Sequence, residues 1–265
     1  MKILNMEKEV FKKIEKLYHF TSFDSCIKIL LSNTLLFGRL CDLNDINELY
    51  RPLFSKTLEE TDFDYVRNII SQYQQLSLTQ DDKRVDKAGF DIPAMWGHYA
   101  DKGRGACLVF NKAKLLKNKP SFVLQTGSVD YDKTYTPDIH FSTNKNGTLV
   151  PFTEQEIADL FFKKTVDWSY EQEFRIIGKN DINDHRLLYE IGDSLEGIIL
   201  RRADDISPDK KIFSSRNFII LKKILGEKRI NDELFWQRRI WEYNSFTNER
   251  NLCDFEGDSP WSVYS

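Results

Sequence analysis

Two glutamates and an arginine stand at alternate positions of one short stretch, as Glu171, Glu173 and Arg175. Side chains alternate between the faces of a β-strand, so an extended chain places these three on one face. Phe174 and Ile176 then face the other way and can pack into a core. Two carboxylates about 7 Å apart on one face repel each other unless water, a cation or a ligand intervenes. The stretch is therefore either a half-exposed strand on which Arg175 neutralises Glu173, or a carboxylate-centred site.

Other side chains that can do chemistry stand at the edges of predicted elements. His19 and Thr21 lie on a short predicted strand, and Ser77 and Thr79 lie on a second predicted strand with alternating residues. A short helix predicted at Pro93–Ala100 carries Trp96, His98 and Tyr99. Each has a structural explanation, because a lone histidine often serves only as a hydrogen-bonding group. Aromatic residues at i and i+3 of a helix are typical of a core. Sequence position does not bring these residues together, so their convergence is a hypothesis.

The motifs of three familiar chemistries are missing from the sequence. A metal site calls for closely spaced histidines, cysteines or carboxylates, and the four histidines are scattered without HExxH or HxH spacing. There is no GxSxG nucleophile motif, no phosphate loop and no dinucleotide fingerprint. What remains is a carboxylate-centred site beside aromatics and a histidine, for which we expect no metal.

Composition narrows the range of partners. The 265 residues carry a net charge of −3, so general nucleic-acid binding is not expected. The four cysteines have no CxxC spacing, and three of them lie in apolar or helical runs typical of reduced core thiols. Neither a signal peptide nor an apolar run of about 18 residues is present. We expect a cytoplasmic protein without a membrane partner.

The predicted elements alternate along the chain without a Pro/Gly/Ser-rich linker, which favours one α+β domain over residues 1–265. Its sheets should be mixed and mostly antiparallel, with flanking helices. Ser22 is a candidate N-cap for an amphipathic helix that Asn33 ends in a left-handed turn. Ala106–Phe110 is a continuous apolar strand.

Three further segments have testable local patterns. The charged stretch Gln80–Ile92 lacks periodicity and precedes the aromatic helix, so we expect a mobile loop that orders on ligand binding as a lid does. Asn217–Lys222 is predicted as a strand. Asp232–Tyr243 is predicted as a helix rich in aromatic residues.

An ordered set of short motifs resembles a large bacterial family catalogued only as a domain of unknown function. The motifs are Leu-Tyr-His-Phe-Thr (17–21), Leu-Asn-Asp-Ile-Asn-Glu (43–48), Met-Trp-Gly-His-Tyr-Ala-Asp (95–101), Gly-Ala-Cys-Leu-Val-Phe (105–110), Val-Asp-Tyr (129–131) and Trp-Ser-Tyr-Glu-Gln-Glu-Phe-Arg (168–175). Leu-Ser-Leu-Thr (76–79) departs from that pattern, since the family tends to have Cys-Phe-Ser there.

The order of these pieces is also similar to the ADP-ribosyltransferase fold. That resemblance implies that His19 holds the adenosine half of NAD and that Thr79 with Ser77 shapes the nicotinamide pocket. It implies that Glu173 hydrogen-bonds the nicotinamide ribose and that Glu171 orients an acceptor. Trp96 or Tyr99 would stack on nicotinamide, and Thr21, His98 and Arg175 would complete the cofactor-binding set.

The implied chemistry suits a carboxylate. Cleavage of the nicotinamide–ribose bond builds positive oxocarbenium character, which a fixed carboxylate stabilises most in the transition state. The resemblance thus implies an NAD-dependent ADP-ribosyltransferase-like enzyme, as in a toxin or phage-defence effector, with a protein, nucleic acid or small molecule as acceptor. The alternative is a non-catalytic domain of the same fold that recognises a nucleotide or a protein. Intact carboxylates favour the enzyme, and the weak Ser/Thr strand favours the alternative.

Overall fold

The computed structural model describes residues 15–39, 70–117, 119–133, 161–180, 185–201, 220–221, 223, 240–244 and 249–252. The motif at 43–48 lies outside them. The chain divides into two compact units, each assembled from separate segments. The first unit includes the described parts of Met1–Thr34, Thr79–Asn118 and Glu190–Ser265, and the second those of Leu35–Leu78 and Lys119–Tyr189. The expectation of a single domain stays a prediction.

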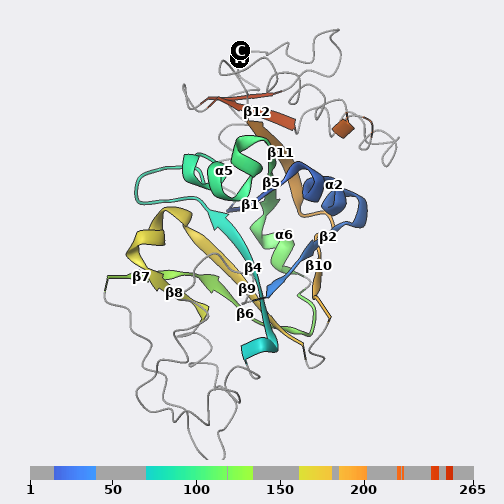
Figure 1. The fold of residues 1–265 in the computed structure, drawn as a ribbon, viewed down its shortest axis with the longest axis vertical. Coiled ribbons are helices and arrows are strands. Elements are labelled where there is room, and N and C mark those ends of the chain that lie inside the picture. The colour runs from blue at the N-terminus through green and yellow to red at the C-terminus, as the bar shows by residue number, and fades with distance from the viewer. Residues whose placement is uncertain are drawn as a thin grey trace, which may run out of the picture. The chain divides into compact units, whose positions relative to one another are not determined.

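The helices and strands follow each other as labelled in Figure 1. The first unit contains β1 (Lys16–Thr21), α2 (Phe23–Ser32), α5 (Pro93–Tyr99), the 3-10 helix η4 (Asp101–Gly103), β5 (Ala106–Asn111), α6 (Lys112–Lys117), β11 (Leu195–Arg201), β12 (Ile240–Asn244) and β13 (Glu249–Leu252). The second contains β3 (Gly38–Arg39), β6 (Val123–Ser128), β7 (Asp130–Asp132), β8 (Lys163–Thr165), the 3-10 helix η5 (Val166–Glu171) and β9 (Glu173–Lys179). Three strands include residues of both units: β2 (Thr34–Leu36), β4 (Tyr73–Gln80) and β10 (Leu188–Glu190).

The sheet of the first unit has the order β13-β12-β11-β5-β1, and β1 also pairs with the last two residues of β4. In Figure 1, β5 lies between β1 and β11. Every residue of β5 is buried, as its continuous apolar run predicts. The described pairings of this sheet are antiparallel except that of β11 with β12, which is parallel.

Helix α2 begins and ends where its sequence predicts. Ser22 has an extended backbone and its hydroxyl accepts a hydrogen bond from the Ser25 N–H at 3.2 Å. Asn33 closes the helix in the left-handed conformation, and its N–H donates to the Ile29 carbonyl at 2.8 Å. Both caps satisfy backbone groups that a helix end otherwise leaves without partners.

A tight turn follows α5. Asp101, Lys102 and Gly103 have positive φ angles of 47°, 56° and 84°. The carbonyl of Ala100 accepts hydrogen bonds from the N–H groups of both Gly103 and Gly105, at 2.9 and 2.8 Å. A Cβ on Gly105 would lie 2.1 Å from the Thr21 carbonyl oxygen, so the chain at this point has room only for glycine.

In the second unit, β9 lies between β4 and β6, and β3 also pairs with β4. A short parallel pair, β7 with β8, forms a separate two-stranded sheet. Apolar side chains such as Phe37, Tyr73 and Ile176 form the core, and the Tyr73 ring lies 5.3 Å from that of Phe161. Helices and mostly antiparallel sheets together confirm the α+β class. None of the described helices is long and apolar enough to cross a membrane.

Two local predictions near the C-terminus were wrong. Ile240–Asn244 is strand β12 rather than the end of the helix expected at Asp232–Tyr243, because its backbone pairs with β11, and residues 232–239 lie outside the described part of the chain. Ile220 and Leu221 are helical rather than extended. A short apolar run of this kind cannot be assigned by periodicity alone. The stretch Gln80–Ile92 contains a turn closed by a bridge between Asp82 and Lys87, while its mobility stays a prediction.

Candidate functional site

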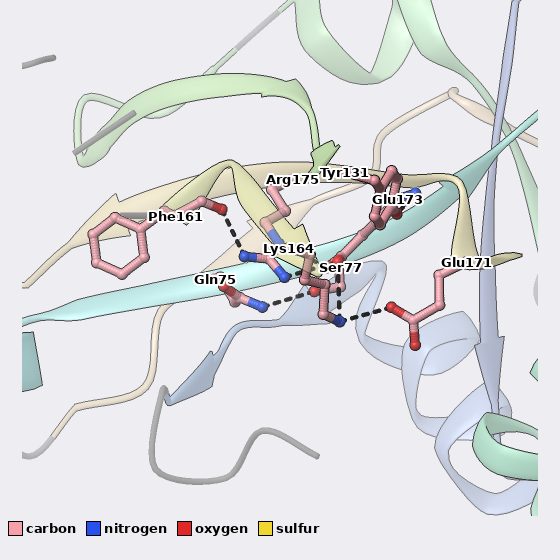
Figure 2. A network of polar contacts seen from close by, with 8 residues as sticks. All are labelled: Gln75, Ser77, Tyr131, Phe161, Lys164, Glu171, Glu173 and Arg175. Carbon is pink, nitrogen blue, oxygen red and sulfur yellow. Dashed lines mark hydrogen bonds and ion pairs between the residues drawn. The ribbon is translucent and has the colours of Figure 1, made fainter. Parts of the chain in front are cut away.

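Four charged side chains meet in the second unit, where each is at most 4% exposed: Lys164, Glu171, Glu173 and Arg175. We call them the ion cluster (Figure 2). They come from β8, the last residue of η5, and β9. Two cations and two carboxylates balance in charge, which is what burial of ionised groups requires.

Glu173 and Arg175 form a two-pronged ion pair on one face of β9. The Arg175 Nε donates to Glu173 Oε1 at 2.9 Å, and Nη2 donates to Oε2 at 2.8 Å. The third guanidinium nitrogen, Nη1, donates to the Phe161 carbonyl at 2.6 Å. The predicted partnership of these residues is confirmed, but the half-exposed strand face is wrong, since both side chains are buried.

Lys164 connects the two glutamates. Its ammonium donates to Glu171 Oε2 at 2.8 Å and lies 3.5 Å from Glu173 Oε2. The same Nζ lies 4.6 Å from the centre of the Trp168 ring, within the range of a cation–π interaction. Figure 2 shows the ammonium between the two carboxylates.

Glu171 is not part of the strand that was expected to carry it. It ends η5, and the next residue, Gln172, has the left-handed backbone angles φ 45° and ψ 50°. The chain turns there, so β9 begins only at Glu173. Alternation along one strand therefore does not place the two glutamates side by side. Their shared contact with Lys164 does.

The backbone of Glu173 is fixed on both sides. Its N–H donates to the phenol oxygen of Tyr131 at 2.9 Å, and its carbonyl accepts from the Val129 N–H at 2.9 Å. Burial raises the pKa of the Tyr131 phenol, and the nearby charges of Glu173 and Glu171 raise it further, so the group stays protonated. The first residue of β9 is thus held in place independently of its side chain.

Strand β4 adds a serine to the cluster. The Ser77 hydroxyl hydrogen-bonds the carboxylate of Glu173, and its oxygen accepts a hydrogen bond from Gln75 Nε2 at 3.0 Å. Ser77 is exposed, whereas Gln75 and Glu173 are buried. The amide oxygen of Gln75 is buried and has no hydrogen-bond partner among the residues that the structure describes. Ser77 is the exposed residue among those labelled in Figure 2.

The environment keeps Glu173 ionised. Burial by itself raises the pKa of the carboxyl, but the charges of Arg175 and Lys164 and the hydrogen bonds from Arg175 and Ser77 outweigh it. Together they lower the pKa of Glu173 to about 2. A carboxylate that stays charged at neutral pH can stabilise a developing cation or orient a hydroxyl group, but it cannot act as a general acid.

The predicted site residues are divided between the two units. The second unit brings together Ser77, Glu171, Glu173 and Arg175. The first holds the others: His19, Thr21, Thr79, Trp96, His98 and Tyr99. β1 pairs with β4 in the first unit, and β9 neighbours β4 in the second. The meeting of His19 with Glu173 in one pocket stays a prediction.

Within the first unit, the candidates differ in exposure. Trp96 is completely buried; its indole N–H donates to the Phe90 carbonyl at 2.8 Å and its ring packs edge-on against Phe20. His98 is exposed and Tyr99 is half-buried, with ring centres 6.2 Å apart. Trp96 therefore has a clear packing role, and His98 is the exposed one of the three candidates on this helix.

Sequence patterns did not point to four participants in the site: Gln75, Tyr131, Lys164 and Trp168. Tyr131 and Trp168 belong to the motifs at 129–131 and 168–175, but no sequence pattern predicts the contact of Tyr131 with Glu173 or that of Trp168 with Lys164. Lys164 follows another lysine, and no local pattern shows which of the two is buried. Their roles depend on pairings between distant segments, such as that of Tyr131 with Lys164 in the β7–β8 sheet.

The fold and cluster define an α+β protein with a buried ion network at the start of a strand. Residues 95–176 match a family model described as a protein of unknown function (DUF2971), which supports the expected kind of family. The match contains all four residues of the ion cluster and the motifs at 95–101, 105–110, 129–131 and 168–175. No curated protein and no solved structure matches the chain. In the described part of the chain, no group of three or more His, Cys, Asp or Glu side chains could hold a metal ion.

Proposed function

We propose that the protein is an NAD-dependent ADP-ribosyltransferase-like enzyme with Glu173 as its catalytic carboxylate. The observation that carries the proposal is the hydrogen bond between Ser77 of β4 and the ionised Glu173 of β9. The resemblance assigns these two residues to one nicotinamide–ribose pocket, although they lie far apart in the sequence. Their contact supports that assignment.

The reaction breaks the glycosidic bond between the ribose C1′ and the nicotinamide nitrogen. Nicotinamide leaves with the bonding electron pair, and positive charge develops on the ribose ring. A nucleophilic group of the acceptor then forms a bond to C1′ and loses its proton to a base or to solvent. Glu173 needs no proton for this role, because a charge fixed beside the ribose stabilises the cationic transition state.

The ribose would approach from the side of Ser77. This residue is exposed while the carboxylate behind it is buried, so a ligand hydroxyl meets Ser77 first. Displacement of the Ser77 hydroxyl by a ribose hydroxyl would conserve the hydrogen bond to Glu173. Arg175 would keep the carboxylate in place during this exchange, since its three nitrogens are all engaged.

The proposal extends to the setting of the reaction. We place the enzyme in the bacterial cytoplasm, as a toxin or phage-defence effector that uses NAD as substrate and no metal. Its acceptor is a protein, a nucleic acid or a small molecule. His19, Thr21, Thr79, Trp96, His98 and Tyr99 remain the proposed contacts to the rest of NAD.

One observation favours a second candidate, a non-catalytic domain that recognises a nucleotide or a protein. Both oxygens of Glu173 already accept hydrogen bonds from Arg175, and Lys164 lies close to one of them. A carboxylate so engaged can be a purely structural part of the fold. Under this candidate, the ligand is bound and not consumed.

The test compares nicotinamide release from NAD by wild type and Glu173→Gln, offering protein, nucleic-acid and small-molecule acceptors. Because Glu173 is a buried ion-pair partner, the substitution should cost roughly 3–5 kcal/mol of stability, so both proteins must be assayed where circular dichroism shows them folded. The enzyme proposal expects release to fall by roughly 10²–10³ with little loss of NAD binding. Equal release from both proteins would remove Glu173 from the mechanism. NAD binding without any release by wild type would favour the recognition domain.

A further inference from the structure

We propose that Lys164 is a positioning residue of this site: its ammonium is the shared counter-cation that holds the carboxylates of Glu171 and Glu173 together. This role rests on the proposed function, because it concerns the state in which the two carboxylates meet a substrate. Neither the sequence motifs nor the family resemblance assigns a role to Lys164.

The geometry requires a cation between the glutamates. Glu171 approaches from the end of η5 and Glu173 from the start of β9, and both are buried. Two buried carboxylates without a shared cation repel each other, and one would take up a proton or move towards solvent. Lys164 Nζ lies 2.8 Å from Glu171 Oε2 and 3.5 Å from Glu173 Oε2, so its single positive charge attracts both carboxylates.

Arg175 does not replace Lys164 in this task. Its Nε and Nη2 both bind Glu173, and its Nη1 binds the Phe161 carbonyl on the other side. Within the described part of the chain, the guanidinium thus binds the carboxylate of Glu173 in a fixed plane. The compact ammonium of Lys164 has three donors on a flexible stem and can serve two carboxylates from different elements.

The surroundings of Lys164 are built to keep the ammonium there. Trp168, from the same 3-10 helix as Glu171, places its ring 4.6 Å from Nζ. Lys164 is the middle residue of β8 and pairs in register with Tyr131 of β7, whose phenol holds the backbone of Glu173. The β7–β8 sheet therefore fixes both the main chain and the carboxylate of Glu173.

Lys164 acts through the carboxylates and need not touch the substrate. Without it, Glu171 would lose its ion pair with Lys164, and Glu173 would lose one of the two charges that keep it ionised. A raised pKa of Glu173 would then shift the acid side of any pH–rate profile to higher pH. A role limited to packing predicts no such shift, since a methionine of similar length fills the same space.

The first experiment follows the Glu173 carboxyl carbon by ¹³C NMR during an acid titration. Lys164→Met should move its midpoint upward by roughly one pH unit or more, which is about a tenfold change in proton affinity. Lys164→Arg should move it less. The matched control is Lys163→Met, the same substitution at the preceding, partly exposed residue of β8, and it should leave the midpoint unchanged. An unchanged midpoint in Lys164→Met would overturn the proposal.

Chemical rescue separates charge from packing. In Lys164→Ala, n-propylammonium should fill the vacated space, raise the melting temperature saturably and return the Glu173 midpoint towards the wild-type value. 1-Propanol at the same concentration tests the same shape without the charge. If propanol rescues as well as propylammonium, Lys164 serves only for packing and the proposal fails.

A measurement on the wild type covers the case in which the variants do not fold. The ¹⁵Nζ signal of Lys164 should show slow hydrogen exchange, as expected of a buried ion-paired ammonium, and exchange as fast as that of exposed lysines would contradict the role. None of these measurements uses NAD. If the wild-type protein releases no nicotinamide, the proposed enzymatic function is refuted. The titration would still decide whether Lys164 holds the carboxylates of Glu171 and Glu173 together.

Discussion

The guanidinium of Arg175 binds both carboxylate oxygens of Glu173, two residues earlier on the same strand, at 2.8 and 2.9 Å. Residues at i and i+2 of a strand point the same way, which allows this pair. Burial strengthens its effect, because solvent does not screen a pair that is at most 4% exposed. The charge state of Glu173 is therefore a structural property of β9 as well as a proposed catalytic one.

Acid should destabilise the protein through Glu173. Its pKa is lowered from 4.5 to about 2 in the folded state, so between these pH values the unfolded chain binds the proton that the folded one does not. The stabilisation is complete above pH 4.5 and is lost as pH falls towards 2, by an amount on the order of 3 kcal/mol. Urea unfolding at a series of pH values measures the loss.

Glu173→Gln should make the free energy of unfolding less dependent on pH between 4.5 and 2, because the variant has no carboxyl group at this position. Glu190→Gln, which removes a carboxyl from an exposed position of β10, is the control for a simple change in net charge. A wild-type curve that stays level down to pH 2 would contradict the buried, ionised state of Glu173.

Two glycines near the same turn should respond to alanine in opposite directions. In Gly105→Ala the new Cβ would meet backbone atoms of Thr21 and Ala100 at 2.1–3.0 Å, so a loss of about 3 kcal/mol or more is expected. Gly97→Ala places its Cβ in open space on α5 and should stabilise the helix by about 0.5–1 kcal/mol. Thermal unfolding of both variants makes the comparison, and similar effects at the two positions would count against the turn geometry.

Tyr131→Phe should loosen the start of β9. The phenol oxygen accepts the Glu173 N–H, and its loss leaves that donor buried, at a cost of about 1–3 kcal/mol. Amide hydrogen exchange at Glu173 should accelerate. The amide of Val129, which donates to the Glu173 carbonyl, serves as the internal control and should change less. Equal acceleration at both amides would indicate general destabilisation instead.

The turn before α5 should respond to NAD. Reciprocal backbone hydrogen bonds join Asp82 and Lys87 at 2.8 and 3.0 Å, and the Gly89 N–H donates to the Asp81 carboxylate. We expect these amides, with those of Arg84 and Val85, which also donate to Asp82, to exchange slowly, and those of the exposed Lys83 and Asp86 to exchange quickly until ligand is added. Slower exchange at Lys83 and Asp86 with saturating NAD would support the lid. Exchange unchanged by bound NAD would rule it out.

Sequence patterns predicted the elements whose causes are local. Ser22 and Asn33 cap α2 through their own side chain and backbone angles, and β5 follows from its unbroken apolar run. The start of β9 was misplaced, because Gln172 turns the chain within a setting that includes Tyr131 from a distant segment. The alternation of polar and apolar residues also did not show how deeply the strand is buried. A polar strand face has the same sequence pattern whether water or Lys164 covers it.

The interleaving of the two units has a consequence for how the protein is made. On the ribosome, β4 is synthesised long before β9, and a segment of the first unit is synthesised between them. The contact between Ser77 and Glu173 therefore cannot form until β9 has been made. Contacts between such distant segments are slow to form, and folding should be limited by them. A fragment restricted to residues 95–176 would contain every charge of the ion cluster and yet lack Ser77, Gln75 and the strand that carries them. Such a fragment should not assemble the site by itself.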